Sequence, residues 1–284
     1  MDQDSYLSLF VNSAFAGNPL GALSLFFLFL ARMLPIIQSA PFFGSRVLAN
    51  PVKVGFAICI FVIFLPQLMA QTKTPLDFNF VLLIYLVKEM IIGMFMGHII
   101  SLPFVIAQSA GIIIDNQRGG ASLMVNDPTV QNQSSPLGTL FNMVLIYLFY
   151  AIGGPWDFLN ALSLSYDLLP PDQFIVAGFF STDAFPIGQF VKMLNQVMVM
   201  TTQLATPALI AILMTDSFLG IANRLAPQVQ ITFLGMPLKS LLGLTIVCIG
   251  WRVMVTQMVA QCKYWQDHLV ELLYVFNIYG TPPG

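Results

Sequence analysis

The sequence predicts an all-α membrane protein of about six kinked apolar helices arranged as helical hairpins. Of its 284 residues, 57% are hydrophobic and only 8% are charged, and the mean hydropathy is +0.81. Soluble domains carry about 25% charged residues, so the chain falls outside that class. Apolar stretches recur with the roughly 20 residues that a bilayer-spanning helix needs, and prolines interrupt several of them.

The expected helices cover residues of about 20–38, 52–70, 79–107, 137–153, 188–215 and 236–262. Proline lies within or at the end of four of these stretches, at Pro35, Pro66, Pro103 and Pro207. Because proline removes a helical hydrogen bond, bent helices packed mainly on protein describe the chain better than six straight spans facing lipid. The segment 153–188 is rich in proline and acidic residues, and we expect it to form an external loop.

The composition also limits the possible functions. The net charge is −2 and Lys and Arg form no cluster, so we expect no nucleic-acid partner. Cys59, Cys248 and Cys262 are far apart and form no C-x-x-C motif, and the histidines and acids lack metal-ligand spacing. We therefore expect no disulfide, metal or cofactor. The acidic start lacks the basic residues of a secretory signal, so no cleaved signal peptide is expected.

A helix-packing seam is predicted in the third apolar stretch. Glu89, Gly93 and Gly97 recur every four residues, so they share one helix face, and the two glycines allow close helix approach. A charge in hydrocarbon costs at least about 2.5–3.5 kcal/mol, so the carboxylate should face a partner helix. Glu89 is either a packing group or part of a proton relay. If it packs, Glu89→Gln should be tolerated, because a neutral amide could keep the hydrogen bond.

The most polar interruption of the chain runs from residue 108 to residue 138. An apolar island at 121–125 lies at its centre, between Gly119-Gly120 and Asp127-Pro128. Glycine permits unusual backbone angles and Asp-Pro starts a turn. The island is therefore either a movable plug or part of a plain connecting loop, and from the residues alone the connecting loop is the simpler interpretation.

The plug hypothesis assigns roles to particular residues of this loop. A narrow hydrophobic constriction excludes water and ions, which is the role of Leu123, Met124 and Val125. Asp115 and Arg118 are three residues apart and should pair on one helix face, so that reversing both charges together should restore function lost in either single reversal. The hinge and anchor residues of this hypothesis are Asp115, Arg118, Gly119, Gly120, Asp127 and Pro128.

Several short motifs, in a fixed order, resemble one known family. They are Ala31-Arg32-x-x-Pro35, Pro41-Phe-Phe-Gly44, Pro51-Val-Lys53, Ala110-Gly-Ile-Ile-Ile-Asp115-Asn-Gln-Arg118-Gly119, Asp127-Pro128, Ser135-Pro-Leu-Gly138 and Pro237-Leu-Lys239. Together they cover about residues 20–262 and resemble the type III export-apparatus membrane proteins, flagellar FliR and its injectisome counterpart SctT. The Asp-Asn-Gln-Arg-Gly form is more similar to the injectisome branch.

The resemblance implies a noncatalytic, multi-pass subunit of the export gate in the bacterial inner membrane. One copy would join SctR-like, SctS-like and SctU-like subunits, and the assembly would conduct unfolded secreted polypeptides through the lipid bilayer. Residues 1–185 would form an SctR-like portion that includes the loop 108–138. Residues 186–284 would form an SctS-like helical hairpin and a C-terminal tail. The resemblance also implies that the segment 111–133 contains a plug of the closed pore.

Two other classes of function compete with this interpretation. A secondary transporter or ion channel with broken helices would use Glu89, Asp115 and Asp216 as ion-coupling groups, but it should show inverted repeats, and none is convincing. An intramembrane enzyme would use His98 and Ser101. These two residues lie three apart, yet the chain has no G-x-S-x-G motif and no third member of a triad.

Overall fold

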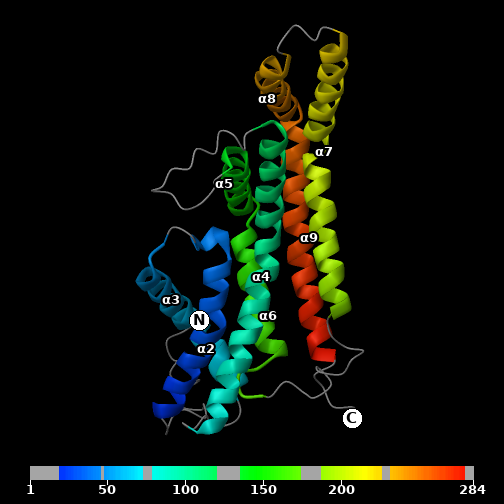
Figure 1. Ribbon diagram of the computed structural model, residues 1–284. Coiled ribbons are helices and arrows are strands. Elements are labelled where there is room, and N and C mark those ends of the chain that lie inside the picture. The colour runs from blue at the N-terminus through cyan, green and yellow to red at the C-terminus, as the bar shows by residue number, and fades with distance from the viewer. Residues whose placement is uncertain are drawn as a thin grey trace. The chain divides into compact units, whose positions relative to one another are not determined.

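The computed structural model describes residues 19–45, 48–72, 79–119, 135–173, 187–225 and 231–278, and structural statements refer to these ranges (Figure 1). Within them the chain forms α-helices and one 3-10 helix, without strands, which confirms the predicted all-α class. The elements are α2 (Pro19–Ser39), η1 (Pro41–Phe43), α3 (Asn50–Gln71), α4 (Phe80–Gln117), α5 (Pro136–Ala151), α6 (Gly154–Leu168), α7 (Ile187–Leu225), α8 (Ile231–Ile249) and α9 (Trp251–Ile278).

The helices are long and apolar enough for a multi-pass membrane protein. In the described part of the chain, four helices are each long and apolar enough to cross a membrane: α2, α3, α4 and α7. Two bent helix pairs raise the total to as many as six if each pair forms one span. The four prolines singled out in the sequence lie inside these four helices. The described residues therefore contain four to six apolar spans, some of them bent, which agrees with the predicted kinked apolar helices.

Helix α4 extends ten residues beyond its predicted end near residue 107. Its last turns carry Ala110 and Ile114, which are fully buried, so tertiary packing extends the helix past Pro103. The predicted loop 108–138 is correspondingly too long, because the described chain is helical to Gln117 and helical again from Pro136. Helix α7 likewise continues to Leu225 instead of ending near residue 215.

Two glycines mark breaks between consecutive helices, at Gly153 and Gly250. Helix α5 ends at Ala151 and α6 begins at Gly154, after Gly153, whose φ of +80° is left-handed and favours glycine. Residues 154–168, expected to be part of an external loop, form α6 because one face of this stretch is apolar and buried, including Phe158 and Leu162. The predicted last helix is α8 and α9, which meet at 65° around Gly250.

The described helices divide into two compact units, and the first combines residues from three parts of the chain: 1–101, 153–186 and 264–284. Helix α2 packs on α3 and η1, and α3 packs on α6. An aromatic core joins these helices, because the ring of Phe29 lies 5.4 Å from that of Phe61 and is stacked on Tyr166 at 5.8 Å. This core places α6 beside α2.

The second unit contains residues 102–152 and 187–263. Helices α7 and α8 lie side by side as a hairpin (Figure 1), and Gly243 of α8 faces Ile212 of α7 so closely that an added Cβ would lie 3.1 Å from the Ile212 side chain. The end of α4 and the start of α5 also approach closely at Gly111 and Gly138. The resemblance divides the chain at residue 185 into an SctR-like portion and an SctS-like hairpin. This division stays a prediction.

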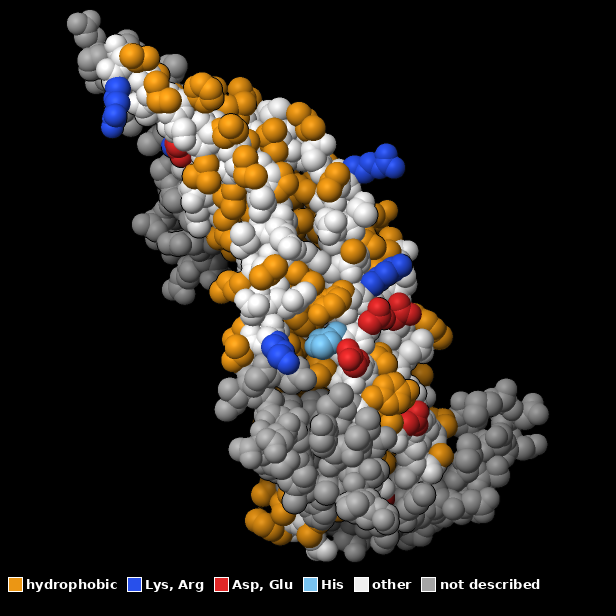
Figure 2. All heavy atoms as spheres, turned by 90° about the vertical axis from the view of Figure 1, so that its right-hand side faces the viewer, with side chains coloured by type: hydrophobic (Ala, Val, Ile, Leu, Met, Phe, Trp, Pro, Cys, Tyr) orange, Lys and Arg blue, Asp and Glu red, His pale blue; other side chains and the backbone are white. Residues whose placement is uncertain are grey.

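Helix α7 exposes a large apolar surface. Figure 2 shows many hydrophobic and few charged side chains in the region of this helix. Met198, Met214, Phe218 and Leu225 are each at least 60% exposed. A patch of this kind on a chain of this composition marks a surface that lipid or another protein covers.

Candidate functional site

Two groups of buried charged side chains stand out in this apolar protein. The Glu89 cluster, in the first unit, consists of Arg32, Lys88, Glu89 and Ser165. The Asp115 cluster, in the second unit, consists of Asp115, Arg118, Ser135 and Ser240. Glu89 in the first cluster and Asp115 and Arg118 in the second were predicted as site residues from the sequence. Buried charge is costly in an apolar protein, so both clusters are candidate functional sites.

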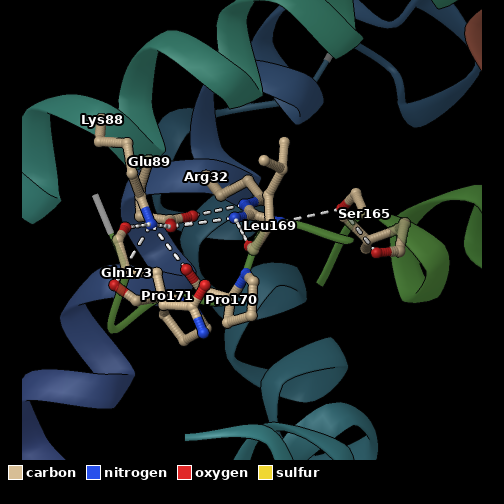
Figure 3. A network of polar contacts seen from close by, with 9 residues as sticks. Arg32, Lys88, Glu89, Ser165, Leu169, Pro170, Pro171 and Gln173 are labelled. Carbon is tan, nitrogen blue, oxygen red and sulfur yellow. Dashed lines mark hydrogen bonds and ion pairs between the residues drawn. The ribbon is translucent and has the colours of Figure 1, made fainter. Parts of the chain in front are cut away.

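Arg32 of α2 and Glu89 of α4 form a two-pronged ion pair with no exposed side-chain surface (Figure 3). Nε of Arg32 donates to one carboxylate oxygen of Glu89, and Nη2 donates to the other at 2.9 Å. The remaining guanidinium contacts lead to α6, because Nη1 donates to Oγ of Ser165 and Nη2 to the carbonyl of Leu169, both at 2.9 Å. The guanidinium also lies 3.9 Å from the centre of the Tyr166 ring, within cation–π range.

Lys88 brings a second cation to the same carboxylate (Figure 3). Its Nζ lies 2.8 Å from Oε1 of Glu89 and donates to the carbonyls of Pro170 at 2.8 Å and Gln173 at 3.0 Å. These carbonyls follow the C-terminal end of α6, where the aligned peptide dipoles leave partial negative charge. The excess positive charge of the cluster is therefore compensated by backbone oxygens.

This geometry favours the packing interpretation of Glu89. The carboxylate joins α2 to α4, and its two cations reach the turn after α6. It also changes the expectation for Glu89→Gln. Because both carboxylate oxygens accept hydrogen bonds from cations, an amide would turn its NH₂ group toward Arg32 or Lys88. We now expect the amide to impair the protein.

Gly93 and Gly97 lie one and two turns after Glu89, on the face of α4 that meets α2. A Cβ added at Gly93 would lie 2.0 Å from the carbonyl oxygen of Arg32, and one at Gly97 would lie 2.9 Å from Cα of Ile36. Only glycine fits this approach of two helix backbones.

The Asp115 carboxylate binds partners on both sides of the segment 120–134. Its Oδ1 accepts from Arg118 Nε at 2.7 Å and pairs with Nη2 at 2.6 Å, so the predicted pair forms. Its Oδ2 accepts from the Ser135 hydroxyl and from the backbone N–H of Leu137 at 3.0 Å. Ser135 in turn caps α5, because its Oγ accepts from the N–H of Gly138 at 2.9 Å.

One carboxylate therefore holds both ends of the segment 120–134. The chain leaves α4 through Gly119, whose φ of +87° is left-handed as a hinge glycine would allow. Ser135 was not predicted as a site residue, although a serine followed by proline is a typical start of a helix. Gly120, Leu123, Met124, Val125, Asp127 and Pro128 lie outside the described residues, so the plug and hinge roles stay predictions.

The Asp115 geometry changes the expectation for a charge swap. The double variant Asp115→Arg, Arg118→Asp recreates an ion pair, but an arginine at 115 cannot accept the hydrogen bonds of Ser135 and Leu137. We therefore expect the double reversal to restore less than half of the stability lost in Asp115→Arg, measured as the midpoint of thermal unfolding in detergent. Full recovery would show that the contacts to α5 are dispensable.

The residues of the two competing hypotheses are arranged differently from what those hypotheses need. The hydroxyl of Ser101 donates to the backbone carbonyl of His98 at 2.6 Å and not to its imidazole ring. Asp216, the third proposed ion-coupling group, pairs with Lys239. Among the described residues, no group of three His, Cys, Asp or Glu side chains could hold a metal ion.

The fold and these clusters define a multi-pass helical membrane protein whose buried charges join helices. The family model of bacterial export proteins, family 1, matches residues 23–264. The chain therefore belongs to this family, as its resemblance to FliR and SctT predicted.

Similar proteins come from both branches of the family. The Yop proteins translocation protein T of Yersinia pestis is 31% identical over 218 residues, which are 76% of this chain and 79% of that protein. The secretion system apparatus protein SsaT of Salmonella typhimurium is 29% identical over 227 residues (78% and 82%). The flagellar biosynthetic protein FliR of Escherichia coli is 28% identical over 225 residues (79% and 83%).

Proposed function

We propose that this chain is a noncatalytic subunit of the type III protein secretion export gate. It helps to form and close the protein-conducting channel of the bacterial inner membrane, and one copy joins SctR-like, SctS-like and SctU-like subunits. The observation that carries the proposal is family membership over residues 23–264. The named relatives, a translocation protein, a secretion system apparatus protein and a flagellar biosynthetic protein, support the same role.

The Asp115 cluster supports a gating role for the segment 120–134. A plug needs ends that stay in place while its centre moves, and the two ends of this segment share one buried carboxylate. The apolar side chains of Leu123, Met124 and Val125 suit a seal that excludes water without charge. Methionine adapts to an irregular gap because its side chain is flexible.

Deleting residues 120–126 tests this role. The deletion keeps Asp115, Arg118 and Ser135, and eight residues remain between Gly119 and Ser135. At roughly 3.3 Å per residue they easily join two ends that contact the same carboxylate. We expect an assembled complex that leaks small ions, with a conductance at least tenfold above that of the wild type.

A full-length variant separates the loss of the seal from the shortened chain. Replacing Leu123, Met124 and Val125 by serine keeps the length and should leak as the deletion does. Conductance of the purified complex in planar bilayers is the measurement. A deletion complex that assembles and stays closed to ions would contradict the gating role of this segment.

A further inference from the structure

Arg118 connects the Asp115 carboxylate to a third helix of the second unit. While Nε and Nη2 of Arg118 contact Asp115, its Nη1 donates to Oγ of Ser240 on α8 at 3.2 Å. The Arg118 side chain is only 10% exposed. One guanidinium thus bridges the carboxylate that holds α4 and α5 and a hydroxyl of the α7–α8 hairpin.

Ser240 belongs to a part of α8 that is attached on two sides. Its neighbour Lys239 pairs with Asp216 of α7, and Gly243, one turn later, lies against Ile212 of the same helix. Two consecutive residues of α8 therefore contact different helices, one toward α7 and the other toward the end of α4. A displacement of the hairpin would move Ser240 relative to Arg118.

We propose that Ser240 is a positioning residue that couples the α7–α8 hairpin to the ends of the segment 120–134, through Arg118 and Asp115. The inference rests on the proposed function, because the coupling matters for export only if this segment closes the channel. It adds a route by which the position of the hairpin changes how firmly the ends of the segment are held.

The coupling follows from the hydrogen bonds that the Arg118 guanidinium makes to both Ser240 and Asp115. Arg118 presents a planar set of N–H donors, so fixing one edge of the guanidinium on Ser240 orients the edge that binds Oδ1 of Asp115. Without the Ser240 hydroxyl, an N–H in a mostly buried place lacks this acceptor, and the guanidinium reorients toward water. The Asp115 carboxylate then loses its fixed orientation, and its other oxygen no longer holds α5 as firmly.

The backbone N–H of Leu137 reports this orientation directly. It lies in the first turn of α5, where an N–H has no partner within the helix, and its acceptor is Oδ2 of Asp115 at 3.0 Å. Its hydrogen exchange therefore measures how long the carboxylate stays in place. Ser240 is on another helix, so a purely local effect of its replacement would leave this exchange unchanged.

The experiment is amide hydrogen exchange on the full chain, purified with its co-purifying subunits. We expect Ser240→Ala to speed exchange of the Leu137 amide by about tenfold, as for loss of a charge-assisted hydrogen bond, and Ser240→Thr to restore the wild-type rate. Thr245→Val is the matched control on α8, because the Thr245 hydroxyl donates to the carbonyl of Leu241 in its own helix. In an Arg118→Ala background, Ser240→Ala should add nothing.

An unchanged Leu137 exchange rate in Ser240→Ala would overturn the proposal, as would an equal acceleration in the Arg118→Ala background. Conductance of the same complexes separates this outcome from failure of the proposed function. If deletion of 120–126 leaks ions but Ser240→Ala leaves Leu137 unchanged, the coupling is absent and the gate role stands. If Ser240→Ala accelerates exchange but the deletion stays closed to ions, the coupling exists and the gate role fails.

Discussion

Replacing Glu89 by leucine should nearly abolish accumulation of the chain in the membrane. The substitution leaves Arg32 and Lys88 as two buried cations without their carboxylate, and neither has more than 7% of its side chain exposed. Breaking a buried ion pair by removing one partner costs roughly 3–5 kcal/mol. That is a large share of the roughly 5–15 kcal/mol that stabilises a typical folded protein. The steady-state amount of the chain, measured by immunoblot of the membrane fraction, should fall at least tenfold.

Two further variants at this site, with one control elsewhere, separate charge from shape. Glu89→Gln should also reduce the amount, though less than leucine, because one amide oxygen still accepts a hydrogen bond. The triple variant Arg32→Met, Lys88→Met, Glu89→Leu should recover part of the loss, since no uncompensated charge remains but the carbonyls of Leu169 and Pro170 lose their donors. Glu271→Leu is the control at a carboxylate that is 73% exposed. Normal accumulation of Glu89→Leu would show that the cluster is dispensable for folding.

Gly93→Ala should have the second largest effect, although it adds a single methyl group. The added Cβ would lie 2.0 Å from the carbonyl oxygen of Arg32, so α2 and α4 must move apart. Inserting atoms into a packed core costs roughly 1–3 kcal/mol and sometimes more. The cost here should reach the upper part of that range, because the obstacle is backbone and the shift also separates Arg32 from Glu89. We expect the midpoint of thermal unfolding in detergent to drop by several degrees.

Gly55 of α3 provides a matched control for this substitution. It is a glycine inside a helix of the same unit, and a Cβ added there would meet nothing within 4 Å. Gly55→Ala should therefore be neutral or stabilise the helix by up to about 1 kcal/mol. Equal effects of the two substitutions would show that helix propensity, and not the close approach of α2 and α4, decides the outcome at Gly93.

Local patterns in the sequence predicted the class and much of the candidate site. Hydropathy located the apolar helices because a span must satisfy its backbone internally and present apolar side chains. Helical spacing placed Glu89 and Gly93 on one face, and it predicted the pair of Asp115 and Arg118, which lie within one turn of each other. Each of these inferences depends on residues that are close in the chain.

Only the tertiary structure could supply the partners that come from distant parts of the chain. Arg32 is 57 residues from Glu89, and Ser240 is 122 residues from Arg118, and no periodicity connects such positions. The same limit explains the errors in helix ends. The buried face of residues 110–114 extends α4, and the packed face of residues 154–168 turns a predicted loop into α6.

Composition, helical spacing and motif order are properties of the chain alone, and they were enough to predict an all-α, multi-pass membrane protein of a bacterial export family. Which helices the charged residues join depends on the folded arrangement of the chain. A buried charge is stable only beside a partner of opposite charge or a set of backbone oxygens, and folding selects that partner. For this reason, Glu89 is part of an ion pair with Arg32 and Lys88, and Asp115 joins both ends of the segment 120–134.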